Sequence, residues 1–238
     1  MFTLIQPGGE TEGESLYKGI RLPSPWPPRR TSIGLEPLPL LPYLAPRQEV
    51  IPIDVGRQFF VDDFLIETTT MKRSFHQAEY HWDNPVLKPV KPWEQKAHAK
   101  SAGCAMPFSG GVWYDPADHM FKMWYMGGYT YSTCYATSRD GIHWDKPDLD
   151  LAPGTNIVQG PGHVDSTTVW LNLAAEDPEE RFLLVYGGVG LARFSPDGIH
   201  WGPQHDLGVP RPGGDRGTLF YNPFRKVWVF SLRVSMAV

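Results

Sequence analysis

Two aspartates at matching distances before aromatic residues are the clearest candidates for chemistry in this sequence. Asp165 stands five residues before Trp170, and Asp215 stands five residues before Phe220. Two carboxyl groups that share a cleft can cleave a glycosidic bond, because one donates a proton while the other attacks or stabilises positive charge. Aspartate also caps turns that precede strands, and this structural role is the alternative for both residues.

Two polar neighbours extend this candidate site. His163 lies two residues before Asp165 and is a candidate for hydrogen bonding to a sugar hydroxyl. Arg216 follows Asp215 and is placed to pair with a carboxylate and lower its pKa. A loop position without a ligand is the alternative for each.

Other candidate binding residues lie earlier in the chain. Asp62 and Asp63 form an acidic pair, for which an exposed hairpin is the alternative. Trp93 offers a flat face on which a pyranose ring can stack. The histidines and the two cysteines show no spacing typical of a metal site, so we expect no metal and no cofactor.

An internal repeat indicates which strands would position these residues. The segment Ser-Arg-Asp-Gly-Ile-His-Trp at 138–144 recurs as Ser-Pro-Asp-Gly-Ile-His-Trp at 195–201, 57 residues later. Trp113 and Trp170 are separated by the same 57 residues. Each unit reads as a strand, a polar turn, a strand followed by Gly-Gly, a short strand, an Asp-Gly turn and a strand with His-Trp.

This repeat predicts an all-β fold. Aromatic residues make up 13% of the chain, Gly and Pro number 24 each, and no helical apolar stripe persists. Asp-Gly pairs supply the positive φ of tight hairpins. Four antiparallel strands per repeat are typical of a β-propeller blade. We predict blades of four antiparallel strands at about residues 108–150 and 165–207, and an incomplete blade at 215–238.

The propeller arrangement predicts where the candidate residues meet. The innermost strands of a propeller begin around its central channel, so Asp165 and Asp215 are expected at one depth in a polar pocket. The same count in the first unit gives Phe108, which is no carboxylate. His143 and His200 occupy equivalent positions in the repeat, and we expect them to serve blade packing.

The domain organisation follows from proline density and from the repeat. Residues 1–49 hold nine of the 24 prolines and are predicted to form an extended arm, followed by a partial propeller domain at 50–238. Residues 58–67 read as a strand with an acidic interruption. Propellers need at least four blades, and about two and a half are present. We therefore expect a truncated piece of a longer protein, with association of several copies as the alternative.

Charge and composition exclude several classes of partner. The formal net charge is −4 and no basic stretch is longer than Arg29-Arg30, so nucleic acid is not an expected partner. Prolines interrupt the apolar stretch 33–44, which argues against a signal peptide or a membrane span. We expect a soluble, cytoplasmic protein in which Cys104 and Cys134 are buried free thiols.

Several segments resemble the five-bladed β-propeller glycosidases. These are Asn-Pro-Val-Leu at 84–87, Gly-Gly-Val-Trp-Tyr-Asp at 110–115, Lys-Met-Trp-Tyr at 122–125 and the unit at 135–144. The superfamily includes the glycoside hydrolase family 32 invertases and levanases, the family 43 arabinanases and xylosidases, and the family 130 mannoside phosphorylases. Residues 55–66 are similar to bacterial proteins described as family 32-like. The resemblance covers roughly residues 50–233.

The resemblance implies a five-bladed propeller when complete, with a glycoside as substrate or ligand and hydrolysis through paired carboxylates. Asp165 and Asp215 match the stabilising carboxylates of the superfamily by blade position only. The family 32 motifs Asn-Asp-Pro-Asn-Gly, Arg-Asp-Pro and Glu-Cys are absent from this sequence. We therefore expect this chain to be inactive by itself. A non-catalytic carbohydrate-binding propeller, a structural propeller and a mannoside phosphorylase-like enzyme are the alternatives.

Overall fold

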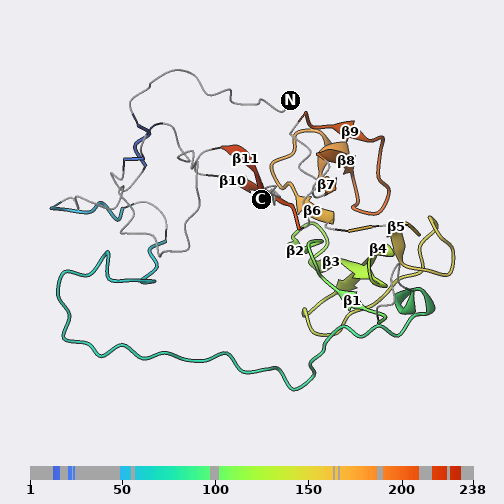
Figure 1. Cartoon of the computed structure of the whole chain (residues 1–238), viewed down its shortest axis with the longest axis horizontal. Coiled ribbons are helices and arrows are strands. Elements are labelled where there is room, and N and C mark those ends of the chain that lie inside the picture. Colours follow the sequence, from blue (N-terminus) through green and yellow to red (C-terminus); the bar gives the residue numbers. More distant parts are fainter. Residues whose placement is uncertain are drawn as a thin grey trace, which may run out of the picture. The chain divides into compact units, whose positions relative to one another are not determined.

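A computed structural model describes residues 13–16, 21–22, 24, 49–54, 57–96, 102–162, 164–165, 167–186, 190–208, 216–223 and 226–231. The chain divides into two compact units, Met1–Gln77 and Ala78–Val238 (Figure 1). The strands of the described residues all lie in the second unit, together with two short 3-10 helices. Across the described ranges, no helix has the length and apolar character needed to cross a membrane.

The first sheet is antiparallel and is arranged around the long strand β3 (Met120–Gly127). One edge of β3 pairs with β4 (Ser132–Ser138), which in turn pairs with β5 (Ile157–Gln159). The opposite edge of β3 pairs with β1 (Ala105–Met106) and, further along, with β2 (Val112–Asp115). Both faces of β3 and β4 are buried, which agrees with the largely apolar sequence of β3 and with the small or aromatic residues of β4.

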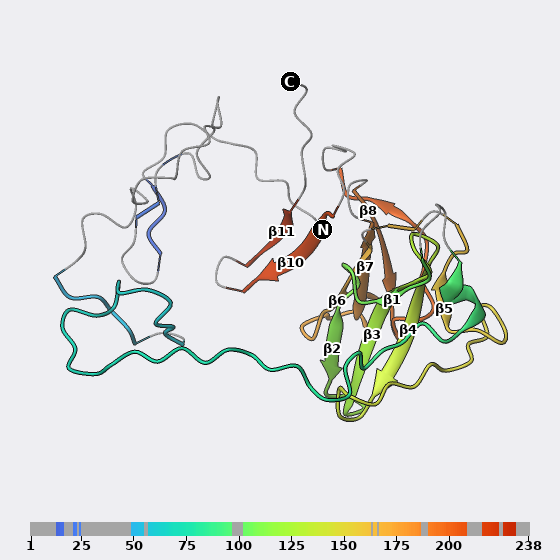
Figure 2. The same cartoon turned by 60° about the horizontal axis from the view of Figure 1, so that its bottom comes forward.

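The second sheet repeats this arrangement with four strands in chain order. It consists of β6 (Thr167–Leu171), β7 (Phe182–Tyr186), β8 (Leu191–Ser195) and β9 (His205–Asp206), each antiparallel to the next. β10 (Thr218–Asn222) and β11 (Val227–Ser231) form a separate antiparallel hairpin. Figure 2 shows the strands of each sheet side by side. The prediction of an all-β fold of antiparallel sheets is confirmed; the second sheet has the predicted four strands, and the first has a fifth strand, β1.

The strand register shows which residues of the repeat are equivalent. Phe121 pairs with Ser138 in the first sheet, and Phe182 pairs with Ser195 in the second. The turn before β7 is longer than the turn before β3 and contains the 3-10 helix η3 (Pro178–Glu180). The segment from Phe182 to Ser195 is shorter than the segment from Phe121 to Ser138, by as many residues as the turn before β7 is longer. Ser138 and Ser195 are therefore again 57 residues apart.

The repeated Asp-Gly turns have the backbone conformation that the sequence predicts. Gly141 has a φ of 77° and Gly198 a φ of 78°, which glycine adopts without a side-chain clash. In the first turn, Ser138 Oγ accepts the N–H of Gly141 at 2.9 Å, and an Asp140 carboxylate oxygen accepts the N–H of His143 at 2.8 Å. The equivalent residues of the second turn make the same bonds. The repeated serine and aspartate therefore build the turn.

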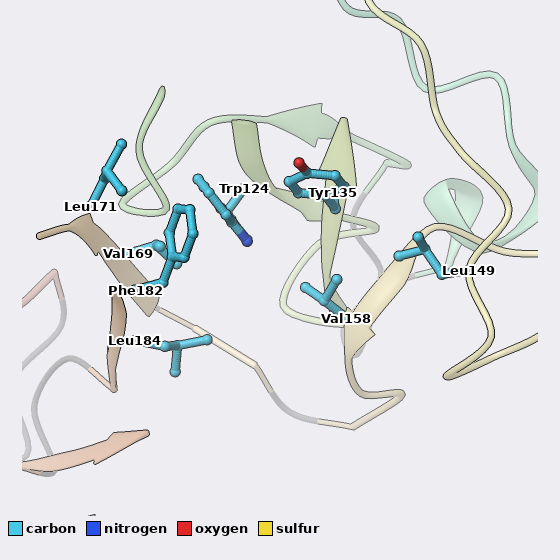
Figure 3. Close-up of a cluster of buried hydrophobic side chains, with 8 residues drawn as sticks. All are labelled: Trp124, Tyr135, Leu149, Val158, Val169, Leu171, Phe182 and Leu184. Atoms are coloured by element: carbon cyan, nitrogen blue, oxygen red, sulfur yellow. The ribbon is translucent and has the colours of Figure 1, made fainter. Parts of the chain in front are cut away.

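The two sheets pack face to face through one buried cluster. Trp124 of β3 is fully buried, and its ring centroid lies 5.5 Å from that of Phe182. Its indole N–H donates to the carbonyl oxygen of Gly198 at 2.7 Å, which joins the first sheet to the second Asp-Gly turn. Figure 3 shows Trp124 between Tyr135 and Phe182. The buried residues of this cluster are Trp124, Tyr135, Leu149, Val158, Val169, Leu171, Phe182 and Leu184.

A buried ion cluster also connects the two sheets. Asp115, at the end of β2, is 1% exposed, lies 2.7 Å from Lys122 Nζ, and pairs with Arg181 from the turn before β7. Lys122 also pairs with Asp118 at 2.8 Å. Burial alone would raise the pKa of Asp115, but the hydrogen bond from Lys122 and the two positive charges hold it below its ordinary value.

In the first unit, residues 58–67 do not form the strand that their apolar content predicts. They adopt bends and a turn, in which the Asp62 carboxylate accepts the N–H of Phe64 at 2.9 Å. Such a local bond competes with sheet pairing. The predicted arm at 1–49 lies largely outside the described residues and stays a prediction.

The two cysteines are free thiols, as predicted. Cys134 in β4 is fully buried, whereas Cys104, just before β1, is half-buried. Burial raises the pKa of Cys134 to about 12.

Candidate functional site

The starts of β2, β6 and β10 bring together Phe108 and Asp165, which the repeat predicts to be equivalent, and Arg216. β6 contacts both β2 and β10. Phe108 lies before β2, and Asp165 lies before β6; both line one small pocket. Arg216 lies before β10, and its guanidinium carbon lies 4.6 Å from the centroid of the Phe108 ring. We call Phe108, Asp165, Arg216 and the residues lining this pocket the inner-strand site.

Two glycines allow the loop before β2 to approach β6. The N–H of Val169 donates to the carbonyl oxygen of Gly110 at 2.9 Å, and the Trp113 indole N–H donates to the carbonyl oxygen of Val169 at 2.8 Å. A side chain at Gly110 would clash with the Trp124 carbonyl group, and Gly111 has a φ of 99°. The Gly-Gly pair therefore fixes the loop that carries Phe108.

Hydroxyl groups line the pocket beside Asp165. Thr167 Oγ1 is buried and has no hydrogen-bond partner among the described residues. Such a hydroxyl is costly unless a ligand or an ordered water satisfies it. The pocket measures about 10 Å³, close to the space that one water occupies, so a larger ligand would lie across its mouth. The other lining residues are Ser109, Gly110, Tyr125, Met126, Ser132, Thr133 and Val164.

A buried polar network lies behind the pocket. The Tyr125 hydroxyl donates to Glu94 at 2.7 Å, and Lys146 Nζ lies 2.5 Å from the same carboxylate oxygen. The side-chain amide of Asn156 donates to the Tyr125 oxygen at 2.6 Å. Burial is the main reason why the pKa of Tyr125 lies above its ordinary value. The phenol therefore stays neutral and acts as a fixed donor to the fully buried Glu94.

Trp93 belongs to this network and does not line the pocket of Asp165. It lies in the 3-10 helix η2 (Pro92–Gln95), and its indole N–H donates to Asn156 Oδ1 at 2.9 Å. The ring packs against the buried cluster on the back of the first sheet. The structure therefore does not bring Trp93 together with Asp165.

Asp62 and Asp63 lie in the first unit and have local partners. Asp62 closes the turn described above, and Asp63 pairs with Arg73. The side chains of this pair are 73% exposed at Asp63 and 46% exposed at Arg73. Both aspartates are exposed, as the hairpin alternative expects, but they lie in bends and a turn and not in a hairpin.

Two predicted site residues, His163 and Asp215, lie outside the described residues. Their part in the inner-strand site stays a prediction. Among the described residues that line the pocket, Asp165 is the one carboxylate.

The two repeated histidines are exposed and pair with carboxylates of their own turns, and His200 also contacts a loop of the first sheet. Their role in blade packing stays a prediction. Nδ1 of His143 lies 2.7 Å from Asp140, and Nδ1 of His200 lies 2.7 Å from Asp197. Nε2 of His200 also lies 3.0 Å from Asp150, in the loop after the first sheet's Asp-Gly turn. Hydrogen bonds to Asp197 and Asp150 raise the pKa of His200. Within the part of the chain that the structure describes, no cluster of His, Cys, Asp and Glu could hold a metal ion.

Thr167 and the pair of Glu94 with Lys146 were missed by the sequence reasoning. Thr167 shares the face of β6 with the buried Val169, and a polar residue at a core-facing strand position is a usable signal. Glu94 and Lys146 are 52 residues apart and belong to no repeat. No sequence pattern connects that pair.

Comparisons of the chain with protein-family models, with curated proteins and with solved structures find no match.

Proposed function

We propose that the two sheets and the β10–β11 hairpin are successive blades of a β-propeller of the invertase and arabinanase type, five-bladed when complete, and that it binds a glycoside at the inner-strand site. Three features support this proposal. The sheets are antiparallel and pack face to face, the first strands of consecutive sheets contact one another, and the residues before these strands meet. These are the relationships between neighbouring blades of a propeller.

The observation that carries the glycoside assignment is the placement of Asp165 beside Phe108 and Thr167. A carboxylate accepts hydrogen bonds from sugar hydroxyls, and an unpartnered threonine hydroxyl can donate or accept. The Phe108 face offers a stacking surface, although Arg216 already covers part of it. Together these groups fit a polyhydroxylated ligand at the mouth of the pocket.

If the protein is an enzyme, hydrolysis follows the two-carboxylate route. One carboxyl group protonates the glycosidic oxygen as the bond to the anomeric carbon breaks, and a carboxylate stabilises or attacks that carbon before water completes the reaction. Asp165 would provide the carboxylate, with Asp215 as the second acidic group. Their separation would define the outcome, at about 5–5.5 Å for retention and about 6.5–9.5 Å for inversion.

A non-catalytic carbohydrate-binding propeller is the second candidate. It is favoured by Phe108, which occupies in the first sheet the position that Asp165 holds in the second. An aromatic residue there adds a contact surface and removes a carboxylate from the site.

The test uses the full chain and a panel of neutral oligosaccharides, with binding followed by calorimetry and hydrolysis by released reducing ends. We expect Asp165→Asn to weaken binding of a captured sugar by at least about tenfold, as loss of a charged hydrogen-bond acceptor does. Asp177→Asn, which changes an exposed carboxylate at η3, is the matched control and should bind normally.

The same panel separates the two candidates. Turnover that Asp215→Asn abolishes while binding persists identifies an enzyme. Because this chain is expected to be inactive by itself, binding without turnover identifies a carbohydrate-binding protein only when a protein with the complete propeller is assayed. If no sugar binds, or if Asp165→Asn binds as well as the parent chain, the proposed function is wrong.

A further inference from the structure

A second pocket lies between the two sheets and shares no lining residue with the inner-strand site. It measures about 280 Å³, near the lower end of the range for small-molecule sites. We call it the intersheet pocket. The first sheet and its loops provide Leu151, Ala152, Ile157, Val158, Gln159 and Gly160, and the second provides Leu184, Tyr186, Arg193 and Trp201.

Trp201 carries a buried donor without a partner, and the repeat shows why. In the first unit, the equivalent Trp144 donates its indole N–H to the carbonyl oxygen of Gly141 at 3.0 Å. In the second unit, the equivalent carbonyl of Gly198 accepts the N–H of Trp124 instead. The Trp201 N–H is buried and has no hydrogen-bond partner among the described residues. A buried N–H in this state favours a ligand that accepts a hydrogen bond.

Arg193 places a positive charge in the same pocket. Its guanidinium donates to the Tyr186 hydroxyl oxygen at 3.1 Å and to the carbonyl oxygen of Gly202 at 2.9 Å, which are both neutral acceptors. In the first sheet, the equivalent position is Ala136, since Met123 pairs with Ala136 as Leu184 pairs with Arg193. The sheet architecture therefore does not require a cation at this position.

The remaining polar groups of the pocket can also donate. The Tyr186 oxygen accepts from Arg193, so its own hydrogen can point to a ligand. Gln159 uses its carbonyl oxygen to accept from Thr133 at 3.4 Å, which leaves its amide NH₂ as a donor. The described residues that line the pocket include no acidic one, and aliphatic side chains form the rest of its wall.

From these observations we infer that the intersheet pocket binds a small carboxylic acid with an apolar body. The carboxylate accepts from the guanidinium of Arg193 and from the indole N–H of Trp201. The apolar body packs against the aliphatic wall formed by both sheets. This inference does not depend on the proposed function, because the two pockets share no residue.

The test uses benzoate as the probe and benzamide as its neutral counterpart. The indole N–H resonances of the ¹⁵N-labelled full chain report binding directly, and Trp201→Phe identifies the relevant resonance. We expect benzoate to shift the Trp201 resonance and to saturate below about 10 mM, with benzamide at least about tenfold weaker.

Three variants make the test specific. Arg193→Gln should weaken benzoate binding by about tenfold or more, because a charged hydrogen bond is lost, and Arg193→Lys should retain more affinity than Arg193→Gln. Trp144→Phe changes the equivalent tryptophan, whose N–H already has a partner, and should leave binding unchanged. Circular dichroism melting verifies that each variant is folded.

Three results would overturn the inference. These are the absence of a saturable shift up to about 10 mM benzoate, equal affinity for benzamide, and unchanged benzoate binding in a folded Arg193→Gln variant.

Discussion

Nε2 of His200 lies 3.0 Å from a carboxylate oxygen of Asp150, although Asp150 belongs to the loop after β4 and His200 to the turn after β8. Nδ1 of the same ring lies 2.7 Å from Asp197. One imidazole is thus held between two carboxylates, and it joins the outer turns of the two sheets.

This contact makes stability depend on pH. Hydrogen bonds to Asp197 and Asp150 raise the pKa of His200 in the folded protein. The stability that this pairing contributes is therefore present below about pH 6.5, the ordinary pKa of histidine, and is lost as the pH rises through the raised value. We expect Tm to fall over this range, and to fall less in Asp150→Asn. Thermal melts between about pH 5.5 and 8.5 measure the effect.

His143→Gln is the control for this prediction, because His143 pairs with Asp140 inside its own turn. It should leave the difference between the parent chain and Asp150→Asn unchanged. Identical pH profiles for the parent chain and Asp150→Asn would show that the contact between the sheets contributes nothing.

The ion cluster around Asp115 predicts that replacing one of its charged residues with an uncharged one lowers the stability of the fold strongly. Lys122→Met leaves Arg181 as the remaining charged partner of the buried Asp115 carboxylate. Breaking a buried pair leaves an undercompensated charge, so we expect the free energy of unfolding to fall by about 3 kcal/mol. Urea denaturation measures the change. Asp118→Asn removes the 46%-exposed partner of Lys122 and should cost less than about 1 kcal/mol. Equal losses in the two variants would contradict this ranking.

The two Asp-Gly turns allow a matched comparison of backbone strain and packing. Gly141 and Gly198 have nearly the same φ, so alanine is strained at either position and should cost about 1 kcal/mol or slightly more. A side chain at Gly141 meets open space, whereas one at Gly198 clashes with the ring of Trp124. We expect Gly198→Ala to cost about 1–3 kcal/mol more than Gly141→Ala in chemical denaturation. Similar costs would mean that Trp124 can move aside freely.

The Cys134 thiol should react only when the sheet opens. It is fully buried, and burial raises its pKa to about 12, so almost no thiolate is present at neutral pH. We expect a maleimide to label Cys134 in a Cys104→Ala background at the rate at which the protein opens, and rapidly in denaturant. Mass spectrometry over time measures this rate. Fast labelling under native conditions would contradict the buried position.

The sequence predicted the repeating part of the fold because the repeated residues have mechanical roles. Ser138, Asp140 and Gly141 build a turn with their own side chains and backbone, so the same residues give the same turn 57 positions later. The strand at 58–67 was predicted wrongly. Its apolar residues favour extended chain, but Asp62 bonds locally to Phe64, and the described residues provide no partner strand.

The site was predicted in part for a similar reason. Counting from equivalent aromatic residues identified Phe108 and Asp165 as equivalent, and the structure places both at one pocket. The count works because the register of β2 and β6 is fixed by pairing with the next strand. The position of Trp93 could not be predicted in this way, because its hydrogen-bond partner Asn156 lies 63 residues away in a different element. The sequence also did not predict the unpartnered N–H of Trp201. The repeat gives Trp201 and Trp144 the same position, whereas the bond from Trp124 to the Gly198 carbonyl depends on packing between the sheets.

The hydrogen bond between Trp124 and Gly198 can form only after a long stretch of further synthesis. Trp124 depends for its cover on Gly198, which is 74 residues further along, and on Phe182. At about 5–20 residues per second, synthesis leaves the face of the first sheet bare for about 4 to 15 seconds. We expect a nascent chain with this tryptophan uncovered for that time to bind chaperones, and slowing translation between residues 124 and 198 would lengthen the aggregation-prone interval.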